Sequence, residues 1–257
     1  DKGGVGPHVD QYDVFLVQGS GKRRWRIGQR CDAATPLRRD TELRILKRFD
    51  TEAEYLLGPG DMLYLPPGLA HWGIAEGPCM TWSVGFRAPS AAEIVQDVAA
   101  EAAERLTEDR RFADPGIAWP SDGEIPASAI AQLRGILQEA LDDEALLAQW
   151  FARHMTGRKY PDLDIAPLRR PSGGIGALLA RGLRIERHPA SRFAWLRGRP
   201  ARLFVDGESI PCPAALARLL CAQAPLPEAK LRAIASTPEA RAVLDRLLAC
   251  GALRRAE

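Results

Sequence analysis

Short apolar runs alternate with glycine and proline turns through residues 1–89, which is the pattern of a β-rich region. The first two runs, Tyr12–Gln18 and Lys22–Ile27, flank Gly19-Ser20-Gly21 and predict a hairpin. Further strands are expected over Leu43–Phe49, Glu54–Leu57, Met62–Leu65, Ala70–Ala75 and Cys79–Phe86. About seven short strands joined by tight turns predict a barrel or sandwich. Because a barrel that closes around a small ligand commonly has about eight strands, we also expect strands upstream of residue 1.

Helical periodicity replaces the strand pattern after residue 89. Ser90 and Glu93 have the spacing of a capping box, and apolar residues then recur every three or four positions through residues 90–106. Two more helices are predicted over Ala127–Gln138 and Asp143–His154. Proline and glycine in the range 160–174 predict a linker. We therefore interpret residues 90–165 as a helical region.

Residues 166–257 combine a predicted strand with short helices. The strand is expected over Ala201–Val205 and ends at an Asp206-Gly207 turn. Three helices are expected over Pro213–Ala222, Pro227–Ser236 and Pro238–Cys250. Each has a proline at or near its start, where the missing N–H of proline removes no helical hydrogen bond. The patterns together predict an α+β chain of three domains: 1–89, 90–165 and 166–257.

Composition narrows the class of protein. The 257 residues are 46% hydrophobic and 26% charged, which is ordinary for a globular protein. A net charge of +2 supplies no global field that would favour nucleic acid. The sequence has no run of about 18 apolar residues that would predict a membrane-spanning helix. The five cysteines form no Cys-X-X-Cys pair, so a reducing, cytoplasmic location is the simplest interpretation.

A candidate metal site lies at the ends of the predicted strands. His8 and Asp10 are separated by one residue, so on a strand their side chains share a face. His71 closes the stretch GPGDMLYLPPGLAH, in which a short strand lies between two turns. Two imidazoles and one carboxylate leave open positions on a metal ion, as in the facial triad of non-haem Fe(II) oxygenases. An isolated His-X-Asp pair is common, but this chain has only four histidines, and two of them lie in matched strand contexts.

The stretches HVD, QGSGKRRW and GPGDMLYLPPGLAHWG resemble the JmjC-type, cupin-fold 2-oxoglutarate oxygenases, and most closely their bacterial ribosomal-oxygenase branch. The similarity covers the full chain. It implies a double-stranded β-helix in residues 1–89 and a helical dimerisation region in residues 90–165. It also implies a winged-helix-like C-terminal domain in residues 166–257.

The same resemblance implies a set of site residues. His8, Asp10 and His71 would hold Fe(II), with 2-oxoglutarate as cosubstrate and O2 as oxidant. The family's cosubstrate anchor is a basic residue fifteen positions after the first metal histidine, which here is Arg23. A guanidinium can hold the distal carboxylate of 2-oxoglutarate through two parallel hydrogen bonds. Strand alternation would direct the two chain neighbours of Arg23 to the opposite face.

Two residues are candidates for the substrate side of the pocket. Tyr12 has the strand parity of His8 and Asp10, so we expect it to line the pocket. Asp1 lies just upstream of a glycine run and is a candidate partner for a cationic substrate side chain. The alternative for Asp1 is a disordered terminal residue.

The family resemblance implies hydroxylation of an arginyl residue in a ribosomal protein, with large-subunit protein sixteen as the substrate. Succinate and CO2 would be released, and the enzyme would be a homodimer. Histidyl hydroxylation of a ribosomal protein, or demethylation, stays open, because pocket shape sets the target. A different class also stays open: a metal-binding cupin sensor that regulates transcription through its winged helix.

An arginine-rich stretch lies in the C-terminal region. Residues 181–202 contain seven arginines against one acidic residue, Glu186. A solvated face is the ordinary interpretation of such a run, and contact with RNA is the functional one. In the helix predicted over Pro227–Ser236, only Lys230 and Arg232 have the charge to contact phosphates. This is little for a DNA-reading helix, so we favour a docking or structural role for the domain.

Overall fold

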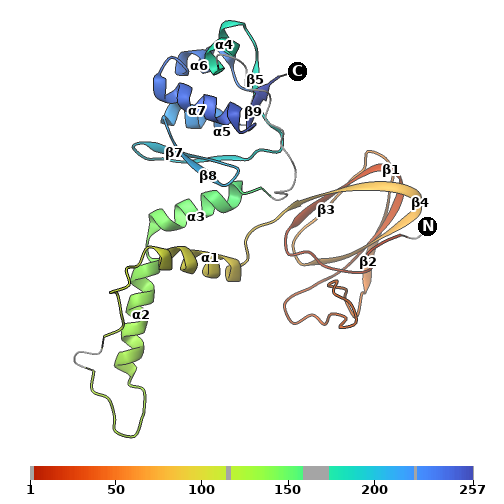
Figure 1. The fold of residues 1–257 in the computed structure, drawn as a ribbon. Helices are drawn as coiled ribbons and strands as arrows, with labels where there is room; N and C mark the ends of the chain where they lie inside the picture. The colour runs from red at the N-terminus through yellow and green to blue at the C-terminus, as the bar shows by residue number, and fades with distance from the viewer. Residues whose placement is uncertain (1–2, 114–116, 159–173, 223–224, 257) are drawn as a thin grey trace. The chain divides into compact units, whose positions relative to one another are not determined.

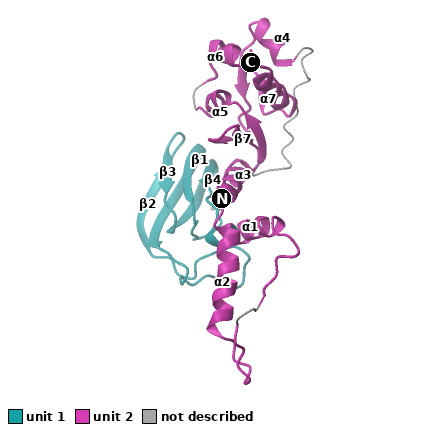
Figure 2. Ribbon diagram, turned by 90° about the vertical axis from the view of Figure 1, so that its left-hand side faces the viewer, with its two compact units in different colours: residues 1–93 teal, residues 94–257 magenta. Residues whose placement is uncertain are grey.

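The computed structural model describes residues 3–113, 117–158, 174–222 and 225–256. The chain forms two compact units, residues 1–93 and residues 94–257 (Figure 2). No helix within the described ranges is both long and apolar enough to cross a membrane.

The first unit is built on an antiparallel sheet that curves around its core (Figure 1). Its strands are β1 (Asp13–Arg30), β2 (Thr51–Leu57), β3 (Met62–Leu65) and β4 (Leu69–Phe86). Strand β1 is central, because β3 pairs with its first half, β2 with its second half and β4 with nearly its whole length. Alternate residues of β1 face inward, and the core comprises Val14, Leu16, Trp25, Ile27, Leu57 and Leu65.

The hairpin expected at Gly19-Ser20-Gly21 is wrong, because β1 runs through these residues as one strand of 18 residues. The expected strands Ala70–Ala75 and Cys79–Phe86 are likewise one continuous strand, β4. The glycines accommodate irregular pairing instead of a chain reversal, since the β1–β4 register shifts on both sides of Ser20. Gly21 has φ +63°, and a Cβ there would lie 2.1 Å from the Pro78 carbonyl oxygen.

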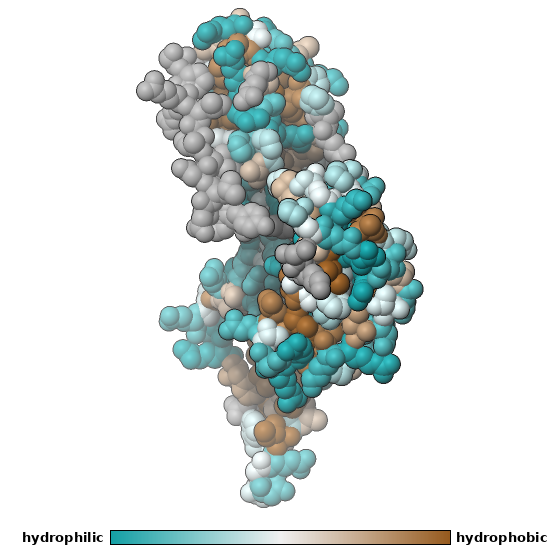
Figure 3. Space-filling model, turned by 90° about the vertical axis from the view of Figure 1, so that its right-hand side faces the viewer, coloured by the Kyte–Doolittle hydropathy of each residue, from teal (hydrophilic) through white to brown (hydrophobic). Residues whose placement is uncertain are grey.

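The strand expected over Leu43–Phe49 is also wrong. This segment makes only isolated bridges, from Ile45 to His8 and from Leu46 to Leu37, and regular pairing begins at Thr51. The expected seven short strands are therefore four strands among the described residues of this unit. Large apolar side chains on the outer side of β3 and β4 are exposed, namely Met62, Tyr64, Met80, Trp82, Val84 and Phe86. Hydrophobic groups also lie among hydrophilic ones in the surface view of Figure 3.

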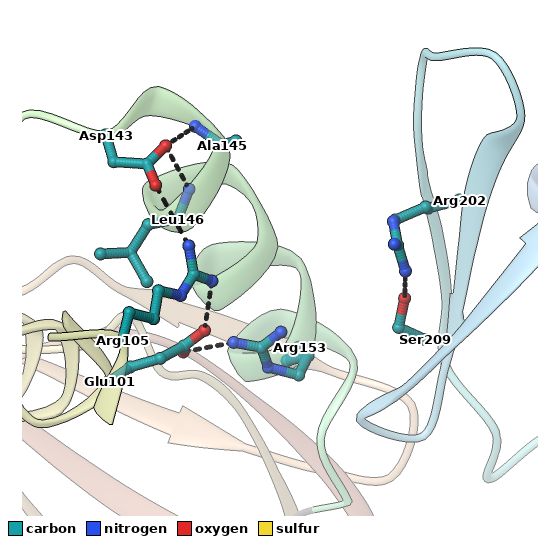
Figure 4. Close-up of polar contacts among 8 residues, drawn as sticks. All are labelled: Glu101, Arg105, Asp143, Ala145, Leu146, Arg153, Arg202 and Ser209. Atoms are coloured by element: carbon teal, nitrogen blue, oxygen red, sulfur yellow. Dashed lines mark hydrogen bonds and ion pairs between the residues drawn. The ribbon is translucent and has the colours of Figure 1, made fainter. Parts of the chain in front are cut away.

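The second unit begins with helices α1 (Ala91–Glu104), α2 (Ala127–Leu141) and α3 (Glu144–Thr156). The predicted capping box is present, since the Ser90 N–H donates to Glu93 Oε2 and the Glu93 N–H donates to Ser90 Oγ. An apolar cluster of Val98, Ala102, Leu146 and Trp150 joins α1 to α3. Polar contacts support the same packing, because Glu101 pairs with both Arg105 and Arg153 (Figure 4).

The C-terminal part of this unit has its own core around two small antiparallel sheets. Its elements are α4 (Gly174–Ala180), β5 (Ile185–Arg187), β6 (Phe193–Leu196), β7 (Ala201–Val205), β8 (Glu208–Cys212), α5 (Ala214–Cys221), α6 (Glu228–Ile234), α7 (Pro238–Ala249) and β9 (Leu253–Arg255). The sheets have the orders β6-β7-β8 and β5-β9. The sequence predicted β7 and α5–α7 but missed the short elements α4, β5, β6, β8 and β9. The domain division at residues 89 and 165 stays a prediction, and the predicted linker lies outside the described residues except for Gly174.

Candidate metal centre

The chain segment before β1 brings His8 directly opposite His71 of β4. The His8 N–H donates to the His71 carbonyl oxygen at 3.0 Å, and the His71 N–H donates back to the His8 carbonyl oxygen at 2.9 Å. This reciprocal bridge places the two imidazole ring centroids 4.3 Å apart. Residues far apart in the sequence are therefore held side by side by backbone hydrogen bonds, independently of any ligand.

Asp10 joins the two histidines in one cluster. One ligand atom from each of His8, Asp10 and His71 lies within 4.8 Å of the others, and the described residues contain no second group of this kind. The Asp10 Oδ2 to His71 Nε2 distance is 3.8 Å. His71 is 2% exposed, whereas His8 and Asp10 are half-buried, so the cluster is open on one side.

Backbone carbonyls fix which nitrogen of each imidazole carries the proton. His8 Nδ1 lies 2.8 Å from the Gly6 oxygen, and His71 Nδ1 lies 3.0 Å from the Leu69 oxygen. A carbonyl oxygen only accepts hydrogen bonds, so each Nδ1 donates and each Nε2 keeps a free lone pair. Such outer partners orient metal-binding histidines. Burial lowers the pKa of His71, which favours the neutral imidazole that binds metals.

The donor set fits Fe(II). Two imidazole nitrogens and one carboxylate on one side of a metal ion leave positions for other ligands, which is the arrangement of non-haem Fe(II) oxygenases.

On the same sheet as His71, Arg23 carries a positive charge with no carboxylate partner among the described residues. Its Nη1 lies 3.5 Å from the Gly3 oxygen and its Nη2 lies 3.7 Å from Cys79 Sγ, which are long contacts. Its Nε is buried with no hydrogen-bond partner, and no carboxylate in the described part of the chain forms an ion pair with it. Burying such a group is unfavourable unless it is paired, so the site is suited to an anion.

Strand register relates Arg23 to the metal cluster. On β1, Arg23 lies opposite Ala75 and Ile27 lies opposite His71, so four residues, or about 13 Å of strand, separate the two positions. Trp25 occupies the interval, with its ring centroid 6.0 Å from that of His71 and 5.9 Å from Arg23 Cζ. Trp25 is buried in the core, and its Nε1 also lacks a hydrogen-bond partner among the described residues.

The glycine run before His8 packs closely against β4. The Ala75 N–H donates to the Gly3 oxygen at 3.0 Å. A Cβ at Gly4 would lie 2.2 Å from the Gly73 carbonyl oxygen, a distance that real Cβ atoms do not adopt. Only glycine fits at this approach, so Gly4 sets the path of the segment that carries His8. The repeated glycines were the available signal.

The substrate candidates are less well placed. Tyr12 is half-buried, and its ring lies under the Arg87 guanidinium at 5.1 Å and against Gly85 at the other end of β4. It does not touch the metal cluster through any contact described here, so its pocket-lining role stays a prediction. Asp1 lies outside the described residues.

Comparisons with known proteins agree with the fold and the cluster. Residues 1–94 match the model of the JmjC domain, and residues 139–254 match the model of the ROXA-like winged helix. A further model, the AraC-like ligand binding domain, matches residues 49–152, a range that omits His8 and Asp10. Residues 1–94 are therefore assigned to the JmjC domain family.

The curated proteins that this chain resembles include ribosomal oxygenases. The chain is 36% identical over 172 residues to the ribosomal protein uL16 3-hydroxylase of Escherichia coli, a match that covers 66% of this chain and 45% of the relative. It is 44% identical over 100 residues to a probable ribosomal oxygenase of Haemophilus influenzae, covering 37% of this chain and 24% of the relative. The chain thus spans less than half the length of these curated relatives.

Solved structures extend the likeness to nearly the whole chain. The crystal structure of YcfD from E. coli matches with a TM-score of 0.83 and 29% identity, covering 99% of this chain and 68% of that one. The same ribosomal oxygenase in complex with cobalt and 2-oxoglutarate matches with a TM-score of 0.80. The β-rich domain and the winged helix predicted from the sequence are confirmed by these matches.

Proposed function

We propose that this chain contains the catalytic domain and the C-terminal domain of an Fe(II)- and 2-oxoglutarate-dependent protein hydroxylase. The observation that carries the proposal is the cluster of His8, Asp10 and His71 beside the sheet that carries Arg23, a cation without a carboxylate partner among the described residues. The three clustered side chains offer ligands for a metal cation, and the Arg23 guanidinium offers a positive charge for an anion. The 2-oxoglutarate bound to the E. coli structure supports the choice of that anion.

Different residues would bind the metal and the cosubstrate. Fe(II), 2-oxoglutarate and O2 together supply an oxidant that can hydroxylate an unactivated C–H bond. His8, Asp10 and His71 would hold the metal, with the imidazoles kept in orientation by the Gly6 and Leu69 carbonyls.

Arg23 would bind the far carboxylate of the cosubstrate and so fix its direction relative to the metal ligands. The buried ring of Trp25, which lies between Arg23 and His71, excludes water from that interval.

The favoured substrate is an arginyl residue of a ribosomal protein, with large-subunit protein sixteen as the candidate and succinate and CO2 as the other products. The E. coli uL16 3-hydroxylase supports this choice, because its similarity extends over 172 residues. Proteins named as bifunctional lysine-specific demethylase and histidyl-hydroxylase match over only 73 residues at 36% identity, which makes histidyl hydroxylation or demethylation the second choice. A ribosomal substrate would place the enzyme in the cytoplasm.

A transcription regulator is the competing function. The match to the AraC-like ligand binding domain favours it, as does the presence of a winged helix. That match omits His8 and Asp10, which a metal-dependent enzyme would need. Sequence-specific DNA binding without turnover would support the regulator.

Association of two copies through the helical region is also part of the proposal. Exposed apolar side chains with helical spacing support it, namely Ile130, Leu133 and Leu137 of α2 and Leu147 and Phe151 of α3. Light scattering would measure the mass of the wild-type chain and of a Leu133→Asp/Leu137→Asp variant. A monomeric wild-type chain would contradict the association. The arginine-rich stretch 181–202 is the candidate for contact with RNA.

The decisive experiment measures metal uptake and turnover separately. The chain is loaded with Fe(II) without oxygen, and succinate release and one added oxygen atom on ribosomal proteins are then followed by mass spectrometry. Asp10→Ala should weaken Fe(II) binding by more than the roughly 10–100-fold cost of losing an outer partner. Asp13→Ala is the matched control, because Asp13 accepts a hydrogen bond from the Tyr64 hydroxyl outside the cluster. Absence of Fe(II) uptake by the wild-type chain would refute the proposal.

A further inference from the structure

Within the arginine-rich stretch 181–202, the structure distinguishes charged side chains that have polar partners from arginines that are exposed to solvent. Its one acidic residue, Glu186, forms an ion pair with Arg254 at 2.7 Å, so it neutralises no arginine of the stretch. Arg187 donates to the Leu220 carbonyl oxygen at 3.2 Å. The arginines that remain exposed therefore keep their full charge.

Four of these exposed arginines belong to one hairpin, formed by β6 and β7. Arg197 and Arg199 lie in its turn. Arg192 directly precedes β6, and Arg202 lies on β7. The described residues supply no ion-pair partner for any of the four. Arg202 donates to Ser209 Oγ on the adjacent strand, at 3.1 Å (Figure 4). Arg202 is exposed, although Phe204 on the same face of β7 is buried.

The hairpin holds these arginines on a rigid base. The Asp206 carboxylate accepts hydrogen bonds from Ser191 Oγ and the Arg192 N–H, both at 2.9 Å, which closes the open end. Trp195 packs against the core of the domain, and the Arg218 guanidinium lies 5.8 Å from its ring. A cationic surface on a fixed scaffold loses less conformational entropy on binding than one on a loose loop.

We infer that the β6–β7 hairpin binds the phosphate backbone of RNA. Guanidinium groups match phosphate oxygens bidentately, and the chain's net charge of only +2 makes this a local feature. A basic protein would be repelled by the hairpin, whereas RNA that accompanies such a protein would be attracted. The choice of RNA rests on the proposed ribosomal substrate, while the unpaired arginines do not depend on it.

Duplex DNA is the weaker alternative. Helix α6 carries Lys230 and Arg232, and Arg232 is paired with Glu228 at 2.6 Å. In α7, Arg241 donates to the Ala235 carbonyl oxygen. These helices therefore offer few free side chains for base edges in a major groove.

The test measures binding of the intact chain to a short fluorescent single-stranded RNA by anisotropy over a range of salt concentrations. The Arg197→Glu/Arg199→Glu variant should bind at least tenfold more weakly. The neutral variant Arg197→Ala/Arg199→Ala should lower the slope of log K against log salt by about 1.4, or about 0.7 for each lost phosphate contact. Arg181→Ala/Arg184→Ala is the matched control, because it removes exposed arginines of the same stretch outside the hairpin.

The outcomes separate this inference from the proposed function. Fe(II) uptake and succinate release should be the same in the hairpin variants as in the wild-type chain, and thermal unfolding confirms that they fold. Failure of the wild-type chain to bind RNA at low salt, an equal loss in the control variant, or a preference for duplex DNA would each overturn the inference. Loss of Fe(II) uptake in the wild-type chain would instead overturn the enzyme proposal and leave the RNA result standing.

Discussion

Arg23 and Arg24 are adjacent on β1, yet they have opposite electrostatic surroundings. Arg24 forms ion pairs with Glu54 of β2 and Glu76 of β4, and hydrogen bonds to these carboxylates raise its pKa. Arg23 points to the core face and has no carboxylate partner among the described residues. The twofold alternation of a strand thus separates a cation paired with two carboxylates from a cation that has no carboxylate partner among the described residues.

Arg23→Ala should raise the 2-oxoglutarate concentration needed for half-maximal binding by roughly 10–100-fold. The reason is the loss of a charged hydrogen bond to a carboxylate, which contributes about 1.5–3 kcal/mol. Fe(II) affinity should not change, because Arg23 is about 13 Å of strand from the position opposite His71. Titration of the metal-loaded chain with 2-oxoglutarate measures the effect. Arg24→Ala is the control, and an equal shift in that variant would show that the anchor lies elsewhere.

Gly4→Ala should impair metal and cosubstrate binding together. An added Cβ would meet the Gly73 carbonyl at 2.2 Å, so the segment that carries His8 and the Gly3 carbonyl near Arg23 must move. Gly3→Ala is a matched control, since a Cβ at Gly3 meets no atom within 4 Å. Calorimetric titration with Fe(II) and with 2-oxoglutarate distinguishes the two variants. The close approach would be irrelevant to the site if Gly4→Ala bound both ligands normally.

The sequence predicted the clustering of His8, Asp10 and His71 better than it predicted the strands. His8 and Asp10 could be paired from their spacing, and His71 from its turn context, because these are local features. The division of β1 and β4 into four strands failed because glycine and proline mark irregularities as well as turns. Whether the chain reverses at Gly19–Gly21 depends on the strand that lies opposite, and single-sequence patterns do not contain that pairing. The backbone contacts of Gly4 and Leu69 are invisible in the sequence for the same reason.

Asp143→Ala should lower the thermal stability of the second unit. The Asp143 carboxylate caps α3 by accepting from the Ala145 and Leu146 N–H groups, and it also pairs with Arg105 (Figure 4). Loss of an N-cap costs about 1 kcal/mol, and an exposed ion pair adds little to that. The midpoint of thermal unfolding should fall by roughly 2–4 °C. Asp142→Ala, one residue earlier and exposed, should have a smaller effect, and Asp143→Asn should recover most of the loss.

Cys212 should resist alkylation in the folded chain. Burial raises its pKa to about 12 and that of Cys221 to about 11, and all five cysteines are free thiols. The raised pKa leaves little Cys212 as thiolate, the reactive form, and its sulfur is also shielded by the domain core. Cys250 is exposed and should react first with iodoacetamide.

Mass spectrometry of the peptides after timed labelling gives the rate at each cysteine. Denatured protein is the control, because unfolding removes the burial that raises the pKa and should make the rates similar. Equal labelling of Cys212 and Cys250 in the native chain would mean that the core around β8 and α5 opens readily. A large difference would instead show that this core, which supports the β6–β7 hairpin, is closed on the timescale of the reaction.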